Sequence, residues 1–230
     1  ASIFKRWSAG SDLLLTDRKL QLTEAEEFWL QHHPVMRVAI DDTAAPVSFF
    51  DGSGYFRGIT ADLLELIRLR TGLRFEVQRA SGIADMIARL KDGRADVIAA
   101  LTTDGVAKQT LQISRPYLES VYVLVSRASN GQYTSLEQLK DRRIAITRYS
   151  AMDDLSTRYP HIGWIETESS FYSMTLLRSG AVDAVITTLI DANHAVAAHP
   201  DLVIRTTVGS EPASYAMAAS DQSPTLVSIL

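Results

Sequence analysis

The run DVIAAL at residues 96–101 constrains the fold of this chain more than any other stretch. Near-continuous apolar runs of this length are typical of strands that are buried on both faces of a parallel sheet. A polar loop with a glycine, residues 102–105, ends the run. In open α/β sheets, ligands bind at the carboxyl ends of the strands. We therefore expect a binding site at this loop.

Strands and helices alternate in the first half of the chain. Strands are predicted at residues 35–40, 73–77 and 95–101, and helices begin at residue 60 or 61 and at residue 83. In the first of these helices, Leu63, Leu66 and Ile67 form an apolar face at helical spacing. Leu64 and Leu69 widen this face, and Gly72 ends the helix. The β-α-β-α-β order predicts a parallel sheet.

The second half repeats this alternation. Strands are predicted at residues 121–125, 143–147, 182–186, 202–205 and 215–219, and helices at 135–139, 151–158, 170–177, 191–198 and 225–230. Two similar α/β lobes are therefore expected. Upstream of both, Thr23 and Glu26 have the spacing of a capping box, which predicts the start of a helix. Residues 51–54 predict a turn whose flanks pair as a hairpin.

Composition narrows the class of protein. The chain has 230 residues, of which 46% are hydrophobic and 22% are charged, as in soluble globular proteins. Its net charge is −4 and it has no basic tract, which argues against a nucleic-acid partner. The absence of cysteine excludes disulfides, thiolate catalysis and cysteine-ligated metals. No apolar run reaches membrane-spanning length and no signal peptide opens the chain, so it is either a mature protein or a piece of a longer one.

No motif predicts a metal, a cofactor or a catalytic residue. His32 and His33 are adjacent on a predicted helix and point in different directions, so they are expected to be solvated. The other histidines do not have the spacing of metal ligands. The sequence contains no glycine-rich phosphate loop, no G-x-S-x-G elbow and no H-E-x-x-H.

An ordered set of short motifs carries a family resemblance. The motifs are Pro46-Val47-Ser48-Phe49, Gly54 and Gly58, Asp62-Leu63, Gly72-Leu73, Leu90 with Gly93 and Asp96-Val97, Ser114 with Pro116-Tyr117, and Gly180 with Asp183-Ala184. Together they resemble the family 3 periplasmic solute-binding proteins. The resemblance implies a two-lobed α/β Venus flytrap of the periplasmic-binding-protein type II kind. Each lobe is then a mixed, mostly parallel sheet flanked by helices. Lobe 1 is expected at residues 35–118 plus 215–230 and lobe 2 at residues 119–214, after a lead-in at residues 1–34, with the two crossings forming the hinge.

A narrower likeness concerns the lead-in. Residues 22–30 (LTEAEEFWL) with His33-Pro34 are similar to the segment before the flytrap domains of BvgS-type hybrid histidine kinases. Those flytraps often occur in tandem, and residues 4–7 (FKRW) resemble the last helix of a preceding flytrap. An amphipathic N-terminal extension is the alternative for residues 1–22. The resemblance implies a periplasmic domain of an inner-membrane receptor, with a neighbouring flytrap and a homodimer.

In amino-acid-binding members of the family, an arginine holds the ligand carboxylate and an aspartate holds its amino group. The corresponding positions here are Ala107 and Thr188, so both charged groups are missing. A shift of one residue would nominate Lys108 as a weaker substitute for the arginine. Burying a zwitterion without charged partners is costly. Ordinary amino acids are therefore expected to bind weakly or not at all.

Other polar residues are expected at the cleft. Asp41 ends the first strand, Thr102 ends the apolar run, and Phe49 is a candidate aromatic wall. A turn or cap residue is an equally good interpretation of Asp41, and Phe49 fits a core position better. The candidate ligand-binding set is Asp41, Phe49, Thr102, Lys108, Arg148, Tyr149, Ser150 and Thr188.

Arg148, Tyr149 and Ser150 precede a predicted helix, whose N-terminus is suited to anions. If the cleft binds a small anion, Arg148 and Ser150 form the best pair. A surface arginine at a helix start is the alternative for Arg148.

These observations favour a non-enzymatic, ligand-sensing flytrap of a membrane histidine kinase, in which a small solute changes the balance between open and closed lobes. A free solute-binding protein of a transporter and an enzyme on the same fold, such as a dehydratase or a transglycosylase, are the alternatives.

Overall fold

The computed structural model describes residues 21–103, 111–148, 150, 152–220 and 222–230. The predicted helix end at residues 4–7, the loop at residues 104–107, Lys108 and Tyr149 lie outside this part of the chain. Within it, no helix is long and apolar enough to cross a membrane.

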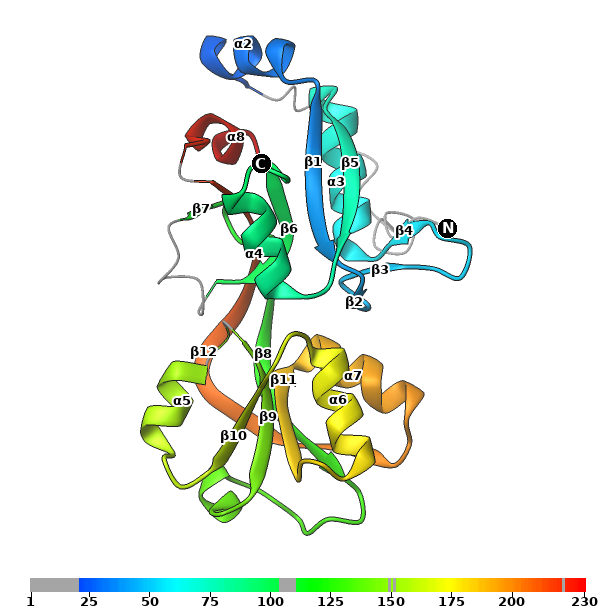
Figure 1. Cartoon of the computed structure of the whole chain (residues 1–230), viewed down its shortest axis with the longest axis vertical. Helices are drawn as coiled ribbons and strands as arrows, with labels where there is room; N and C mark the ends of the chain where they lie inside the picture. The colour runs from blue at the N-terminus through cyan, green and yellow to red at the C-terminus, as the bar shows by residue number, and fades with distance from the viewer. Residues whose placement is uncertain (1–20, 104–110, 149, 151, 221) are drawn as a thin grey trace.

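The described elements form the two-lobed Venus flytrap that the resemblance implies (Figure 1). Lobe 1 contains α2 (Glu24–His32), β1 (Val35–Asp41), β2 (Thr43–Ala44), β3 (Ser48–Phe50), β4 (Phe56–Arg57), α3 (Ile59–Thr71), β5 (Arg74–Ala80), α4 (Ile83–Lys91), β6 (Val97–Thr102), β7 (Leu111–Ile113) and α8 (Pro224–Ile229). Lobe 2 contains the 3-10 helix η1 (Leu136–Leu139), β9 (Arg143–Thr147), α5 (Met152–Arg158), β10 (Gly163–Thr167), α6 (Ser170–Ser179), β11 (Ala184–Thr188) and α7 (Leu189–Ala198). Two long strands, β8 (Leu118–Arg127) and β12 (Leu202–Ser220), run through both lobes.

Each lobe contributes a parallel set of strands to one nine-stranded sheet, whose order is β10-β9-β11-β8-β12-β6-β1-β5, with β7 paired to β12. In lobe 1, β1 lies between β5 and β6 and pairs with both in parallel, as the β-α-β-α-β order predicts. In lobe 2, β9 lies between β10 and β11 and again pairs in parallel with both. The hairpin predicted around residues 51–54 is also present, because β3 pairs with β4.

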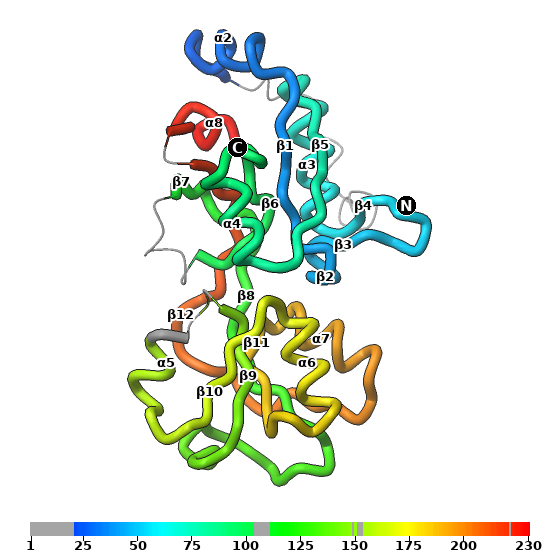
Figure 2. Tube along the Cα trace, viewed as in Figure 1, coloured from blue at the N-terminus to red at the C-terminus, as the bar shows by residue number. Residues whose placement is uncertain are grey.

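The two crossing strands pair with each other in antiparallel fashion, and the tube in Figure 2 shows them side by side between the lobes. The sequence predicted separate strands at residues 202–205 and 215–219, but β12 is one strand of 19 residues. The prediction was wrong because Gly209 and Pro212 break the apolar pattern, whereas pairing with β8 continues on both sides of them through register shifts. Leu118 pairs with Tyr215 at the crossing, and we keep the hinge there as a proposal.

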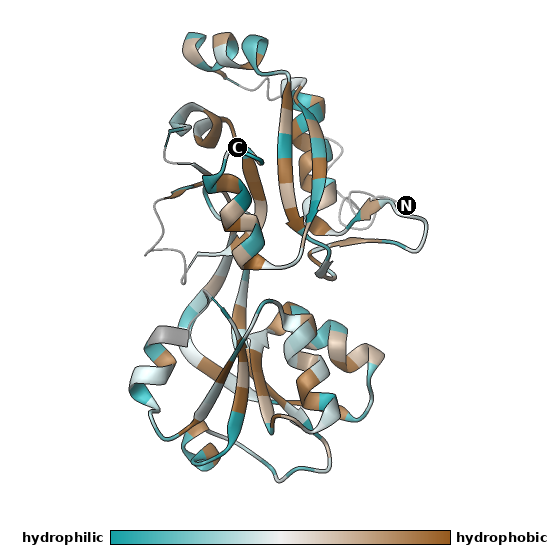
Figure 3. Cartoon of the chain, viewed as in Figure 1, coloured by the Kyte–Doolittle hydropathy of each residue, from teal (hydrophilic) through white to brown (hydrophobic). Residues whose placement is uncertain are grey.

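The core of each lobe lies on both faces of the sheet. Along β1, Val38 and Ile40 pack with α3 and α8, whereas the intervening Ala39 packs with α4, because successive side chains of a strand point to opposite faces. Val97 and Ile98 of β6 are fully buried, which confirms the prediction made from the apolar run. Figure 3 shows β6 brown along most of its length, in contrast to the teal outer faces of the helices. Lobe 2 repeats the arrangement around β9, with one cluster on each face.

Local signals placed most helix ends correctly. Gly72 ends α3 in the left-handed conformation, with φ 77°. The helix itself begins at Ile59, slightly before the predicted start, with Gly58 as N-cap. Leu69 is 67% exposed and lies outside the buried face of the helix, so the prediction that it widens the apolar face was wrong.

Helix α2 is capped and fastened to α8. The Thr23 side chain accepts a hydrogen bond from the backbone of Glu26, and the Glu26 carboxylate accepts one from the Thr23 backbone, which confirms the capping box. The second Glu26 oxygen accepts a hydrogen bond from Ser228 of α8. These bonds lower the pKa of Glu26, the Ser228 bond being the largest cause. Trp29 and Leu30 of α2 pack on the lobe 1 core beside α8.

Replacing Thr23 with alanine is expected to lower the free energy of unfolding by about 1 kcal/mol, because the N-cap acceptor is lost. Urea unfolding checks this. The matched control is Thr175→Ala on the exposed face of α6, where the hydroxyl bonds only within its own helix. Equal midpoints for the two variants would mean that α2 does not unfold together with the lobe.

A candidate ligand cleft between the lobes

A cavity of about 90 Å³ lies between the lobes. Lobe 1, lobe 2 and the crossing strands all contribute to its wall. The residues that line it are Asp41, Ala44, Val47, Ser48, Ile83, Met86, Ala100, Leu101, Thr102, Tyr122, Thr147, Arg148, Ser150, Glu168, Ser169, Ser170, Ile186, Thr187, Thr188, Asp191 and Tyr215.

The carboxyl ends of the parallel strands form much of this wall. Asp41 ends β1, Thr102 ends β6, Thr147 ends β9 and Thr188 ends β11, and all four line the cavity. This is the geometry expected of open α/β sheets. Thr102, at the end of the apolar run, lines the cavity, and the binding site expected at this loop stays a prediction.

The other candidate residues divide into three groups. Arg148 and Ser150 line the cavity together with Asp41, Thr102 and Thr188. Phe49 lies in the small β2-β3-β4 sheet and is not part of the wall. Lys108 and Tyr149 lie outside the described residues.

Glu168 of lobe 2 caps helix α4 of lobe 1. Its backbone oxygen accepts from the Ile83 amide at 3.4 Å, and its Oε2 accepts from the Ala84 amide at 3.4 Å. Gly82, the N-cap of α4, supplies no capping side chain, so the carboxylate from the opposite lobe satisfies amides that would otherwise lack partners. A second bridge joins the lobes where the Thr43 and Ser169 hydroxyls form a hydrogen bond of 3.0 Å. The two lobes are therefore in direct contact at this side of the cleft.

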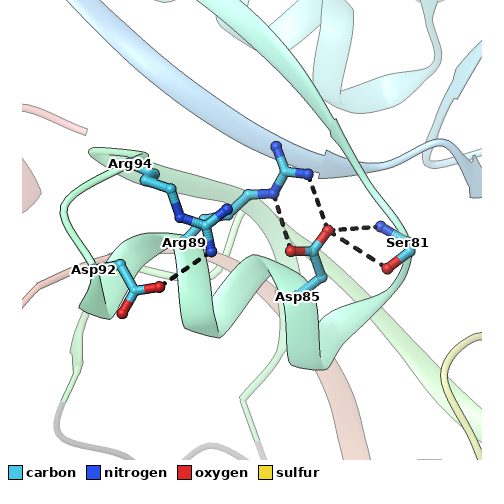
Figure 4. A network of polar contacts seen from close by, with 5 residues as sticks. All are labelled: Ser81, Asp85, Arg89, Asp92 and Arg94. Atoms are coloured by element: carbon cyan, nitrogen blue, oxygen red, sulfur yellow. Dashed lines mark hydrogen bonds and ion pairs between the residues drawn. The ribbon is translucent and has the colours of Figure 1, made fainter.

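The beginning of α4 is held rigidly for this contact. Figure 4 shows Asp85 accepting hydrogen bonds from the backbone and side chain of Ser81 while pairing with Arg89. The ion pair between Asp85 and Arg89 is only a quarter exposed on each side, and the Arg89 bond is the largest cause of the lowered pKa of Asp85. The backbone at Gly82 consequently has little freedom to move away from Glu168.

Arg148 does not offer an unoccupied anion site. Its Nε lies 3.1 Å from Glu166 Oε2, and its Nη1 lies 3.3 Å from Glu168 Oε1. Ser150, its predicted partner, donates instead to the Thr147 backbone oxygen at 2.5 Å. The guanidinium therefore orients the carboxylate that caps α4. This corrects the suggestion that Arg148 and Ser150 are arranged to receive an anion.

Asp41 is a buried carboxylate with one committed oxygen. Oδ1 accepts both the backbone amide and the hydroxyl of Thr43, at 2.9 and 2.6 Å. Burial raises the pKa of Asp41 despite these bonds, and the charges of Asp42 and Glu168 raise it further. The side chain is thus a turn residue that also lines the cavity, and its role in ligand binding stays a prediction.

Asp191 was missed by the sequence analysis. It stands in the first turn of α7, where its amide bonds to the Thr188 hydroxyl and its Oδ2 accepts from Thr187. Its Oδ1 is buried without a hydrogen-bond partner in the structure. Burial raises the pKa of Asp191 to about 6, and the charge of Asp41 contributes to the shift. The spacing T-x-x-D directly after a predicted strand was the signal that could have placed it at the cleft.

Thr188, which the resemblance placed at the aspartate position of amino-acid-binding members, has its hydroxyl engaged within the protein. It accepts from the Asp191 amide at 3.3 Å and bonds to the Tyr215 hydroxyl at 3.0 Å. Burial and the Asp191 charge hold the pKa of Tyr215 well above its ordinary value, so this phenol stays neutral. Thr188 is therefore a helix cap that fixes α7 against the crossing strand.

A second cavity of about 180 Å³ lies beyond Asp191. Asp191 and Ser170 belong to the walls of both cavities. The remaining wall of the second cavity consists of Thr43, Ala45, Phe171, Met174, His194, Ala195, Ala198 and His199.

Comparison with known proteins agrees with this geometry. Residues 36–222 match the model of the bacterial extracellular solute-binding proteins, family 3. The virulence sensor protein BvgS of Bordetella bronchiseptica is 32% identical over all of this chain, which spans only 19% of that protein. The sensor protein EvgS of Escherichia coli K12 is 24% identical over 84% of this chain, and the match covers 16% of EvgS. The crystal structure of the Bordetella pertussis BvgS periplasmic VFT2 domain superposes with a TM-score of 0.82 at 32% identity, over 90% of this chain and 89% of that domain.

The chain belongs to the family 3 extracellular solute-binding proteins, and its fold is that of a sensor-protein Venus flytrap. It spans about a fifth of the length of the curated BvgS relatives that it matches.

Proposed function

We propose that this chain is the ligand-sensing domain of a membrane-bound hybrid histidine kinase and that it binds a small solute between its lobes. The observation that carries the proposal is the cavity between the lobes, whose wall comes from both lobes and beside which Glu168 of lobe 2 contacts α4 of lobe 1. A ligand that contacts both lobes favours the closed state by its differential affinity. The similarity to BvgS and EvgS supports the kinase context.

The domain is further proposed to lie in the periplasm, beside a neighbouring flytrap and within a homodimeric receptor. The BvgS periplasmic chain supports a neighbouring domain, because this chain covers only 41% of it. In this arrangement the domain itself performs no catalysis. It transmits a change in lobe position to the segments that join it to the membrane.

Lobe closure on ligand binding is directly measurable, because the chain contains no cysteine that would compete for labels. Asp92→Cys in lobe 1 and Arg178→Cys in lobe 2 place a donor and an acceptor dye on exposed positions. In a panel of candidate solutes, some compounds are expected to change the energy transfer between the two dyes. This change should saturate as the solute concentration rises. The same labels on Asp92→Cys and Glu65→Cys, both in lobe 1, provide the control and should not respond. Responses of equal size in both pairs would argue against closure.

The sensor context has a separate test in the complete gene. A reading frame that continues into a membrane span and a histidine kinase is expected. A frame that instead encodes only a signal peptide and this domain would support a transporter's solute-binding protein. Turnover of a solute that is lost on mutating a single cleft carboxylate would support an enzyme.

A further inference from the structure

The described wall of the cleft carries more negative than positive charge. Asp41, Glu168 and Asp191 supply three carboxylates, and Arg148 supplies the one guanidinium in this part of the wall. Arg148 is already shared by Glu166 and Glu168. Asp41 and Asp191 are therefore left without a positively charged partner among the described residues.

Each of these carboxylates has one oxygen without a well-formed hydrogen bond to a described residue, and that oxygen of Asp191 is fully buried. Asp41 is only 8% exposed, and its recorded hydrogen bonds all go to Oδ1, which leaves Oδ2 without a described partner. Asp191 Oδ1 is buried and has no well-formed hydrogen bond. The Ser170 hydroxyl lies close enough to lower the pKa of Asp191, but it does not compensate the charge. The two side chains come from opposite lobes, on β1 and α7, and lie close enough for the Asp41 charge to affect the Asp191 pKa. Buried charges are normally paired, so this arrangement is incomplete without a positively charged group.

We propose that the cleft binds a small organic cation whose ammonium group lies between Asp41 and Asp191 and which carries no carboxylate of its own. This inference rests on the proposed function and specifies the class of its ligand. The ammonium would donate hydrogen bonds to one oxygen on each lobe and would thereby link lobe 1 to lobe 2. Closure and charge compensation would occur in the same step.

The same wall disfavours anions and zwitterions. A ligand carboxylate would need a cation or a set of donors, but Arg148 is engaged by two glutamates and the Thr188 hydroxyl is engaged by Tyr215 and Asp191. Inserting a carboxylate beside Asp41 and Asp191 would also add like charges at short range. An amine of the same size avoids both costs.

The test compares three probes of similar size: n-butylamine as cation, butyrate as anion and γ-aminobutyrate as zwitterion. Each is titrated at pH 8 into the whole chain while the midpoint of thermal unfolding is followed, since a ligand that binds only the folded state raises that midpoint. Only n-butylamine is expected to raise it with saturation. Asp191→Asn is expected to weaken binding by about 10- to 100-fold, in line with the loss of one charged hydrogen bond.

The matched control is Asp154→Asn on the exposed side of α5, which removes a carboxylate that pairs with Arg158 far from the cavity wall. This variant should bind n-butylamine as the wild type does. If both variants bound n-butylamine equally weakly, the effect would depend on net charge alone, and the proposal would be overturned. Saturable binding of butyrate or γ-aminobutyrate but not of the amine would overturn it too, while leaving solute binding itself intact. Absence of any shift with the amine at pH 8 counts equally against it.

Discussion

Replacing Gly82 with alanine is expected to hold the two lobes apart. Gly82 precedes α4 in lobe 1, and a Cβ added there would lie 2.7 Å from the Cβ of Glu168 and 3.0 Å from its backbone oxygen in lobe 2. Non-bonded carbon atoms are favourably separated by about 3.5–4.0 Å. The added methyl group can be accommodated only if Glu168 moves away, and this movement opens the cleft.

The steric cost of the added methyl group is comparable to the stabilisation that the closing contacts supply. Overpacking of this kind costs about 1–3 kcal/mol. Three hydrogen bonds close the cleft: those from Ile83 and Ala84 to Glu168, and the one between the Thr43 and Ser169 hydroxyls. Each contributes about 0.5–1.5 kcal/mol. One methyl group therefore offsets much of what these contacts supply to the closed state.

Disulfide trapping measures the closed state directly. Cysteines introduced at Thr43 and Ser169, whose hydroxyl oxygens lie 3.0 Å apart, should cross-link only when the lobes meet. In the Gly82→Ala background, trapping is expected to slow by about tenfold or more. Gly82 has a φ of 133°, so a side chain there also strains the backbone. Gly180→Ala is the control for this strain, because Gly180 has a φ of 83° but no atom lies within 4 Å of an added Cβ. Gly180→Ala should lower the stability of the protein without slowing disulfide formation. Equal rates of disulfide formation in the wild-type, Gly82→Ala and Gly180→Ala backgrounds would contradict the steric argument.

The second large effect concerns Asp191 and pH. Burial raises the pKa of Asp191 from an ordinary value of 3.8 to about 6. Between these two values the folded chain holds a proton that the unfolded chain has released, so stability decreases as pH rises from about 4 to about 6. The lost stability is on the order of 3 kcal/mol, and it stays lost at higher pH.

Asp191→Asn is expected to remove this decrease, so that the variant is more stable than the wild type at pH 8 and similar to it at pH 4. Urea unfolding at intervals from pH 4 to pH 8 measures the difference, with Asp154→Asn as an exposed-carboxylate control. A difference between variant and wild type that does not change with pH would refute the assignment to Asp191. The other titratable or charged groups that line the two cavities around it are Asp41, Tyr122, Arg148, Glu168, His194, His199 and Tyr215, and they are present in all three proteins.

Much of the fold was predictable because its signals are local or periodic. The run at residues 96–101, the capping box at Thr23 and the terminating Gly72 each express a preference that the tertiary structure keeps. The one long strand β12 was not predictable in this way. Its continuity depends on pairing with β8, which lies far away in the sequence.

The candidate site was predicted in position more than in chemistry. Strand ends located Asp41, Thr102 and Thr188 at the cavity, because topology alone brings the carboxyl ends together. The role of Arg148 could not be foreseen, since it depends on Glu166 and Glu168 reaching the same guanidinium across a parallel strand pair. Asp191 was missed because an aspartate in the first turn of a helix ordinarily needs no further explanation.

The antiparallel pairing of β8 with β12 has a consequence for how much work a ligand must perform. The ladder continues across the crossing, and its register shifts between Val208 and Ala213. Such irregularities let paired strands bend and twist without losing the surrounding hydrogen bonds. We therefore expect the backbone to offer little resistance in either direction, so that the contacts across the cleft decide the resting position. Reversing a 99:1 preference takes about 5.5 kcal/mol, an amount that one well-matched small molecule can supply.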